Sequence, residues 1–139
     1  MVKRASYSLR EITGRYLGMP FSEMPCLELV YRIYTDIGVD FPDHYIDVTR
    51  EDFLARWRKK RKGMESLMMR FFREIGNPGN VSNPKRFDLL ACFGQTRAVF
   101  PAVYTGRGHA ITSTIKEGVC VVPVKHMNRV LVVRRVVNG

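Results

Sequence analysis

The sequence lacks any run of about 18 apolar residues, so none of its segments predicts a transmembrane helix. Its basic N-terminal residues are not followed by an apolar stretch, which predicts no secretory signal peptide. These two absences favour a cytoplasmic protein, unless another route exports it.

Cysteine and histidine are also scarce, with three of each among 139 residues. Because Cys26, Cys92 and Cys120 show no Cys-x-x-Cys spacing, the sequence predicts neither a disulfide framework nor a zinc site. The histidines are too scattered to give metal-ligand spacing, and we expect no metal ion and no cofactor. Reduced and mostly buried thiols fit an intracellular protein.

Acidic residues number only 13 against 23 lysines and arginines, so the net charge is +10. This balance favours anionic partners such as nucleic acid or another polyanion. The densest charge run surrounds the single tryptophan and consists of Arg56, Trp57, Arg58, Lys59, Lys60, Arg61 and Lys62. The run suits phosphate binding with indole stacking, and the solvated face of a helix is the alternative interpretation. The sequence has no RNA-binding strand signature and no Gly-rich phosphate loop.

What the sequence does contain is a clearly marked helix that begins at Cys26. Apolar residues recur there at steps of three and four, as one stripe of an amphipathic helix: Cys26, Leu29, Val30, Ile33 and Ile37. Pro25 suits the start of a helix, and Gly38 supplies the stop. In this place Cys26 has two interpretations, a thiolate stabilised by the helix N-terminus or a buried core cysteine.

The chain as a whole predicts one α+β domain over residues 1–139. A helical part covers residues 1–76. A loop rich in Gly, Asn and Pro follows at 77–86. The β part, 87–139, carries the β-branched segments of an antiparallel sheet.

Helical spacing and capping residues predict helices over 8–17, 49–62 and 64–75 in addition to the one at Cys26. About five strands are expected, over Phe87–Phe93, Ala98–Tyr104, His109–Ile115, Val119–Val124 and Arg129–Val137. Because proline has no N–H to donate, we expect Pro101 and Pro123 at a sheet edge or a bulge.

Several short segments carry a family resemblance. They are Tyr16–Phe21, Cys26 with Leu29–Tyr34, Gly38–Pro42, Phe87–Phe93, Val103–Gly106, Gly118–Val119 and Arg134–Val136. Together they resemble the NlpC-type papain-like cysteine peptidases, whose Gly-Asp-Leu-Val strand is similar to Phe87-Asp-Leu-Leu90. The likeness covers most of the chain, with Tyr45–Asn83 the least matched part. It implies a nucleophile-bearing helix packed on a small antiparallel sheet.

The resemblance also implies a chemistry. In that family a cysteine thiolate attacks an amide carbon, a histidine transfers the proton and a polar residue orients the histidine. The implied role is hydrolysis of bacterial cell-wall peptides, or a part in phage tail machinery. Peptidoglycan peptides or phage and cell-wall assembly proteins are then the expected partners, and Cys26 matches the nucleophile position.

The other site positions depart from the family's pattern. Pro25-Cys-Leu-Glu28 stands where the family usually has Asp-Cys-Ser-Gly. The family's catalytic histidine falls on Phe100 and its orienting histidine on Thr112. A phenylalanine cannot accept a proton, so no conventional Cys–His pair is predicted. In an altered hairpin register His109 could act as the base with Thr112 or Thr114 nearby, although strand residues three apart face opposite ways.

Three hypotheses about function follow. The first is a catalytically degenerate NlpC-type protein used for binding or assembly, of bacterial or phage origin. The second is an active cysteine hydrolase that uses Cys26 and His109, with Thr112 nearby. The third is a basic adaptor that binds nucleic acid through residues 56–62, with salt-sensitive affinity.

Overall fold

The computed structural model describes residues 9–39, 76–93, 99–126 and 129–135. Its elements are α1 (Leu9–Tyr16), α2 (Cys26–Asp36), β1 (Asn77–Pro78), β2 (Leu89–Phe93), β3 (Val99–Gly106), β4 (His109–Thr114), β5 (Gly118–Pro123), the 3-10 helix η2 (Val124–His126) and β6 (Arg129–Arg135). In these residues two α-helices precede an antiparallel sheet, which confirms the expected α+β class. No helix among them is long and apolar enough to cross a membrane.

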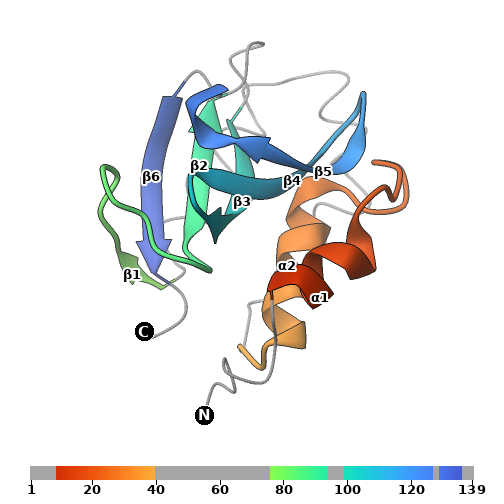
Figure 1. Ribbon diagram of the computed structural model, residues 1–139, viewed down its shortest axis with the longest axis horizontal. Coiled ribbons are helices and arrows are strands. Elements are labelled where there is room, and N and C mark those ends of the chain that lie inside the picture. Colours follow the sequence, from red (N-terminus) through yellow and green to blue (C-terminus); the bar gives the residue numbers. More distant parts are fainter. Residues whose placement is uncertain (1–8, 40–75, 94–98, 127–128, 136–139) are drawn as a thin grey trace.

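The sheet has six strands in the order β1-β6-β2-β3-β4-β5, one more than expected. The additional strand, β1, is two residues long and lies within the segment expected to be a loop. Both helices lie beside the β4–β5 end of the sheet, and β1 and β6 lie at the opposite end (Figure 1). The helices expected over 49–62 and 64–75, and with them the basic run, lie outside the described residues.

Helix α2 begins at Cys26, as the sequence predicts, and packs against β3 and β4. Its apolar stripe is buried, and Leu29, Val30 and Ile37 have no exposed surface. Burying one aliphatic side chain fully contributes about 1.5–3 kcal/mol, so this stripe is the main attachment of α2 to the sheet. Gly38 ends the helix with φ 83°, the left-handed conformation that glycine adopts without strain.

The two faces of the sheet bury different sets of side chains, because successive strand residues point to opposite faces. One face carries a core cluster from four strands: Leu90, Cys92, Ala102, Ala110 and Val133. The alternate residues Leu89, Val103 and Ile111, which pair across β2, β3 and β4, are buried on the other face. The core cluster contains no residue of α2, so α2, which contacts β3 and β4, packs on the second face.

The structure agrees with the expected position of one proline, Pro123, and not with that of the other, Pro101. Pro123 ends the edge strand β5, as expected. Pro101 lies in the interior strand β3 and pairs with Ala91 of β2, so the expectation of an edge or bulge was wrong for it. On its other side the pairing of β3 with β4 runs only from Val103 to Gly106, so no described β4 partner lacks its N–H. Beyond that stretch the Thr112 hydroxyl donates to the carbonyl oxygen of Pro101 at 2.9 Å. On the β4 side of Pro101, this side-chain hydrogen bond therefore takes the place of a backbone hydrogen bond between β3 and β4.

Candidate functional site

The loop before α2 is fixed to the edge of the sheet. The N–H of Gly18 donates to the Val119 carbonyl at 3.0 Å, and the Val119 N–H donates to the Met19 carbonyl at 2.8 Å. Gly118 permits this approach, because a Cβ atom on it would lie 2.2 Å from the Met19 oxygen. The sheet therefore positions the chain just ahead of Cys26.

Cys26 itself is buried, with 4% of its surface exposed. Burial raises the pKa of its thiol to about 12, although hydrogen bonds from the backbone N–H groups of Leu27 and Cys26 act in the opposite direction. Desolvation thus outweighs the helix N-terminus, and the thiol is protonated at neutral pH. Leu27, which stands where the family usually has a serine, is 2% exposed and adds to this apolar surrounding.

The two positions aligned with the family's histidines lie on one face of the sheet. Phe100 pairs with Cys92 and packs against the core cluster. Thr112 is 1% exposed, and its hydroxyl is engaged by the Pro101 carbonyl. Both side chains thus have packing or hydrogen-bonding roles within the sheet.

His109 is in a different environment. It is the first residue of β4, after the turn formed by Arg107 and Gly108, and its side chain is exposed. Its Nδ1 lies 3.0 Å from the Arg107 carbonyl oxygen. His109 and Thr112 fall on opposite faces of β4, as their three-residue spacing predicts. The structure therefore buries Cys26 and Thr112 and leaves His109 in solvent.

A buried polar cluster that the sequence did not single out surrounds Asp88. Its carboxylate accepts a hydrogen bond from the Lys85 N–H at 2.8 Å and lies 3.4 Å from both Nε and Nη2 of Arg135. The Tyr34 hydroxyl donates to the adjacent Phe87 carbonyl at 2.8 Å. Burial, with the Asp88 charge adding to it, raises the pKa of Tyr34 well above its usual value.

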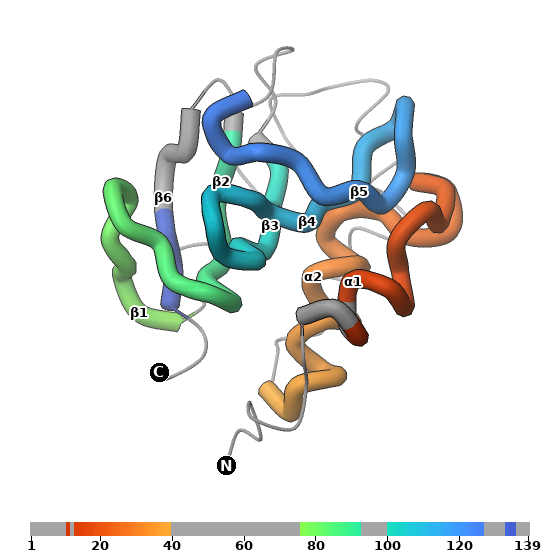
Figure 2. The backbone as a smooth tube through the Cα atoms, viewed as in Figure 1, coloured from red at the N-terminus to blue at the C-terminus, as the bar shows by residue number. Residues whose placement is uncertain are grey.

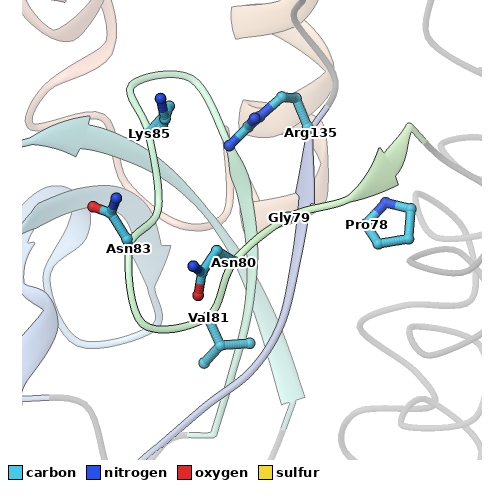
Figure 3. Close-up of a pocket in the computed structure, with 7 residues that line it drawn as sticks. All are labelled: Pro78, Gly79, Asn80, Val81, Asn83, Lys85 and Arg135. Atoms are coloured by element: carbon cyan, nitrogen blue, oxygen red, sulfur yellow. The ribbon is translucent and has the colours of Figure 1, made fainter.

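Next to this cluster lies an open groove of about 590 Å³, here called the β6 groove. It is lined by Pro78, Gly79, Asn80, Val81, Asn83, Lys85 and Arg135 (Figure 3). Most of its lining comes from the segment that begins at residue 76. That segment runs beside β6 (Figure 2). Two cations and two amides line the groove, so it suits an anionic or polar ligand.

The described residues contain no group of three or more His, Cys, Asp and Glu side chains that could hold a metal ion.

The third cysteine, Cys120, lies near Thr114. Burial and the Glu117 charge raise the pKa of the Cys120 thiol, and the hydrogen bond with the Thr114 hydroxyl acts in the opposite direction. Cys120 is half-buried, whereas Cys92 is fully buried. Of the three thiols, Cys120 is thus the one nearest to solvent.

No protein-family model matches the chain, and no curated protein matches it. Among solved structures, it is similar to an NlpC/P60 family protein from Bacillus cereus ATCC 10987, with a TM-score of 0.63 and 18% sequence identity. The match covers 98% of this chain and 41% of the other, so this chain spans less than half the length of that protein. At this identity the likeness shows the fold, which is NlpC/P60-like.

Proposed function

We propose that this chain is a non-catalytic binding or assembly module, of bacterial or phage origin, built on the NlpC-type fold. The observation that carries the proposal is the state of Cys26. A nucleophilic cysteine needs a thiolate and access to substrate. Here the thiol is 4% exposed, and its pKa is raised to about 12.

The residues at the family's other site positions give further support. Phe100, at the position aligned with the catalytic histidine, offers a hydrocarbon ring that takes no proton. It packs on the core cluster of the sheet. His109, the substitute considered from the sequence, is exposed beside the Arg107 carbonyl. Peptidoglycan peptides and phage or cell-wall assembly proteins are the partners that the fold suggests.

The test is alkylation by iodoacetamide against pH, with each cysteine quantified by mass spectrometry. In the folded protein we expect Cys120, which is half-buried, to react first. Cys26 and Cys92 should react only after unfolding in urea, because both thiols are buried and both have a pKa raised to about 12. The His109→Ala variant should leave the Cys26 rate unchanged.

The opposite result would favour the hydrolase hypothesis. Fast alkylation of Cys26 well below pH 8, slowed by His109→Ala, would indicate a thiolate paired with that imidazole. Such a protein should also cleave cell-wall peptides or a related amide. This outcome would overturn the non-catalytic proposal.

A basic adaptor is the second candidate, because the net charge is +10. The basic run from Arg56 to Lys62 would bind phosphates of nucleic acid or another polyanion. Neutralising its lysines should weaken binding to a DNA duplex and flatten its salt dependence. Binding that is unchanged by these substitutions would exclude the run as the interface.

A further inference from the structure

The β6 groove carries an arrangement of charges that neither Cys26 nor the basic run explains. Two of its lining side chains, Lys85 and Arg135, are cations, and Asn80 and Asn83 contribute amides. The one acidic side chain that contacts Arg135 among the described residues is Asp88, which is 1% exposed. Two positive charges against one buried negative charge leave the groove cationic.

The Asp88 carboxylate fixes the position of the Arg135 guanidinium. Its Nε lies 3.4 Å from Oδ1 of Asp88, and its Nη2 lies 3.4 Å from Oδ2. A guanidinium has five N–H donors in a fixed fork, so this contact leaves donors for a second acceptor. The side chain remains 32% exposed. Because Asp88 already orders the guanidinium, binding an anion costs less conformational entropy than at a free arginine.

Lys85 is placed beside it by the same carboxylate. The Lys85 N–H donates to Oδ2 of Asp88, and the Asp88 N–H donates back to the Lys85 carbonyl at 2.9 Å. The side chain of Lys85 is exposed and makes no ion pair with any described residue. Figure 3 shows Arg135 extending from β6 toward the segment that carries Lys85.

Hydrogen bonds and a close packing position hold the wall of the groove. Gly79 donates its N–H to the Val133 carbonyl at 2.8 Å, and a Cβ on Gly79 would lie 2.6 Å from Cγ1 of Val133. The turn beyond it is closed by the Asn83 N–H on the Asn80 carbonyl and by the Ser82 N–H on the Asn80 side chain. Backbone groups thus hold most of the wall, and the Asn80 side-chain oxygen is taken by the Ser82 N–H.

We propose that the β6 groove binds an oxyanion, a phosphate or a carboxylate group of a ligand, between Lys85 and Arg135. Planar or tetrahedral oxyanions are the groups that a fixed guanidinium fork and a nearby ammonium recognise best. The inference goes beyond the proposed function, because it holds whether or not Cys26 is a nucleophile.

The test is a titration of the folded, isotope-labelled chain followed by backbone amide NMR. Sodium phosphate and sodium acetate are added in separate series, with sodium chloride at matched ionic strength as the reference. We expect saturable shifts confined to Gly79, Asn80, Lys85 and Arg135. Saturation by phosphate alone identifies phosphate as the ligand group, and saturation by acetate as well extends the site to carboxylates.

Two lysine variants separate this site from general attraction to a basic protein. Lys85→Ala should weaken phosphate binding by about tenfold, as expected for loss of one charge-assisted hydrogen bond. Lys116→Ala, which removes an exposed lysine from the β4–β5 turn, should leave Kd unchanged. Shifts that fail to saturate with both salts, or an equal effect of the two variants, would overturn the proposal.

Discussion

Arg135 contacts Asp88 through both Nε and Nη2, each 3.4 Å from a carboxylate oxygen, across 47 residues of sequence. The carboxylate is 2% exposed and the guanidinium 32%. This contact joins β6 to the turn that leads into β2, so it fastens the end of the described chain to the middle of the sheet. Both residues lie in segments that carry the NlpC-type resemblance.

Replacing Arg135 alone should therefore destabilise the fold more than replacing both Arg135 and Asp88. We expect Arg135→Leu to lower the free energy of unfolding by about 3 kcal/mol, since it leaves a buried carboxylate without its counter-ion. Adding Asp88→Asn to Arg135→Leu should restore part of that loss. Urea unfolding of the two single variants and the double variant measures the coupling. Strictly additive effects would show that the contact contributes nothing.

The Phe87 side chain is buried, and its backbone has the left-handed conformation that residues other than glycine rarely adopt. Its φ is 70°, and its side chain is 2% exposed. Phe87→Ala should cost about 3–5 kcal/mol through lost packing. Phe87→Gly, which loses the same packing but relieves the left-handed strain, should be about 1 kcal/mol more stable than Phe87→Ala. Thermal unfolding of the pair gives the difference, and the reverse order would refute the strain.

Alanine substitutions at three glycines distinguish the stability cost of steric contact from that of backbone strain. Gly118→Ala should destabilise the protein by about 3 kcal/mol, because the new Cβ meets the Met19 carbonyl and φ is +71°. Gly108→Ala, with φ +79° and open space, should cost only about 1 kcal/mol. Gly14→Ala, in α1 with nothing within 4 Å, should stabilise by about 1 kcal/mol.

The ranking of these three variants in urea unfolding is the measurement. If Gly118→Ala and Gly108→Ala proved equally costly, the close approach of the loop to β5 would not be the cause of the loss.

The raised pKa of Cys26 predicts a fall in stability at alkaline pH. The unfolded chain releases the thiol proton near pH 9.0, whereas the folded chain holds it until about pH 12. The folded state thus binds more protons in this window, so the free energy of unfolding falls as pH rises. Cys26→Ala should reduce that slope by about 1.4 kcal/mol per pH unit. An unchanged slope would mean that the thiol is accessible.

The parts of the fold that depend on local pattern were predictable from the sequence. The start of α2 and the positions of the five longer strands follow from periodicity and from glycine and proline, and the described ends differ by a few residues. Strand β1 was not predictable, because Asn77 and Pro78 are extended only by pairing with Arg135 and Arg134. Its existence depends on a partner more than fifty residues away.

The candidate site was less predictable, for a physical reason. Cys26 stands both at the helix N-terminus and in the apolar stripe, and the sequence cannot tell which environment determines its pKa. Burial of the Cys26 thiol itself decides the direction of the pKa shift, and that burial depends on tertiary packing. The Asp88–Arg135 contact likewise depends on the placement of β6 beside β2, which strand patterns alone do not give.

The contact between the Gly18–Met19 loop and β5 also has a consequence for association between copies of the chain. An exposed sheet edge is a template for strands of other molecules, and proteins that leave one open aggregate. On β5 the outward groups of Val119 are taken by the loop, and Pro123 has no N–H to offer. At the other end of the sheet β1 is only two residues long. Both edges are thus poor seeds for fibril growth, even though Val121 is exposed between the two blocked positions.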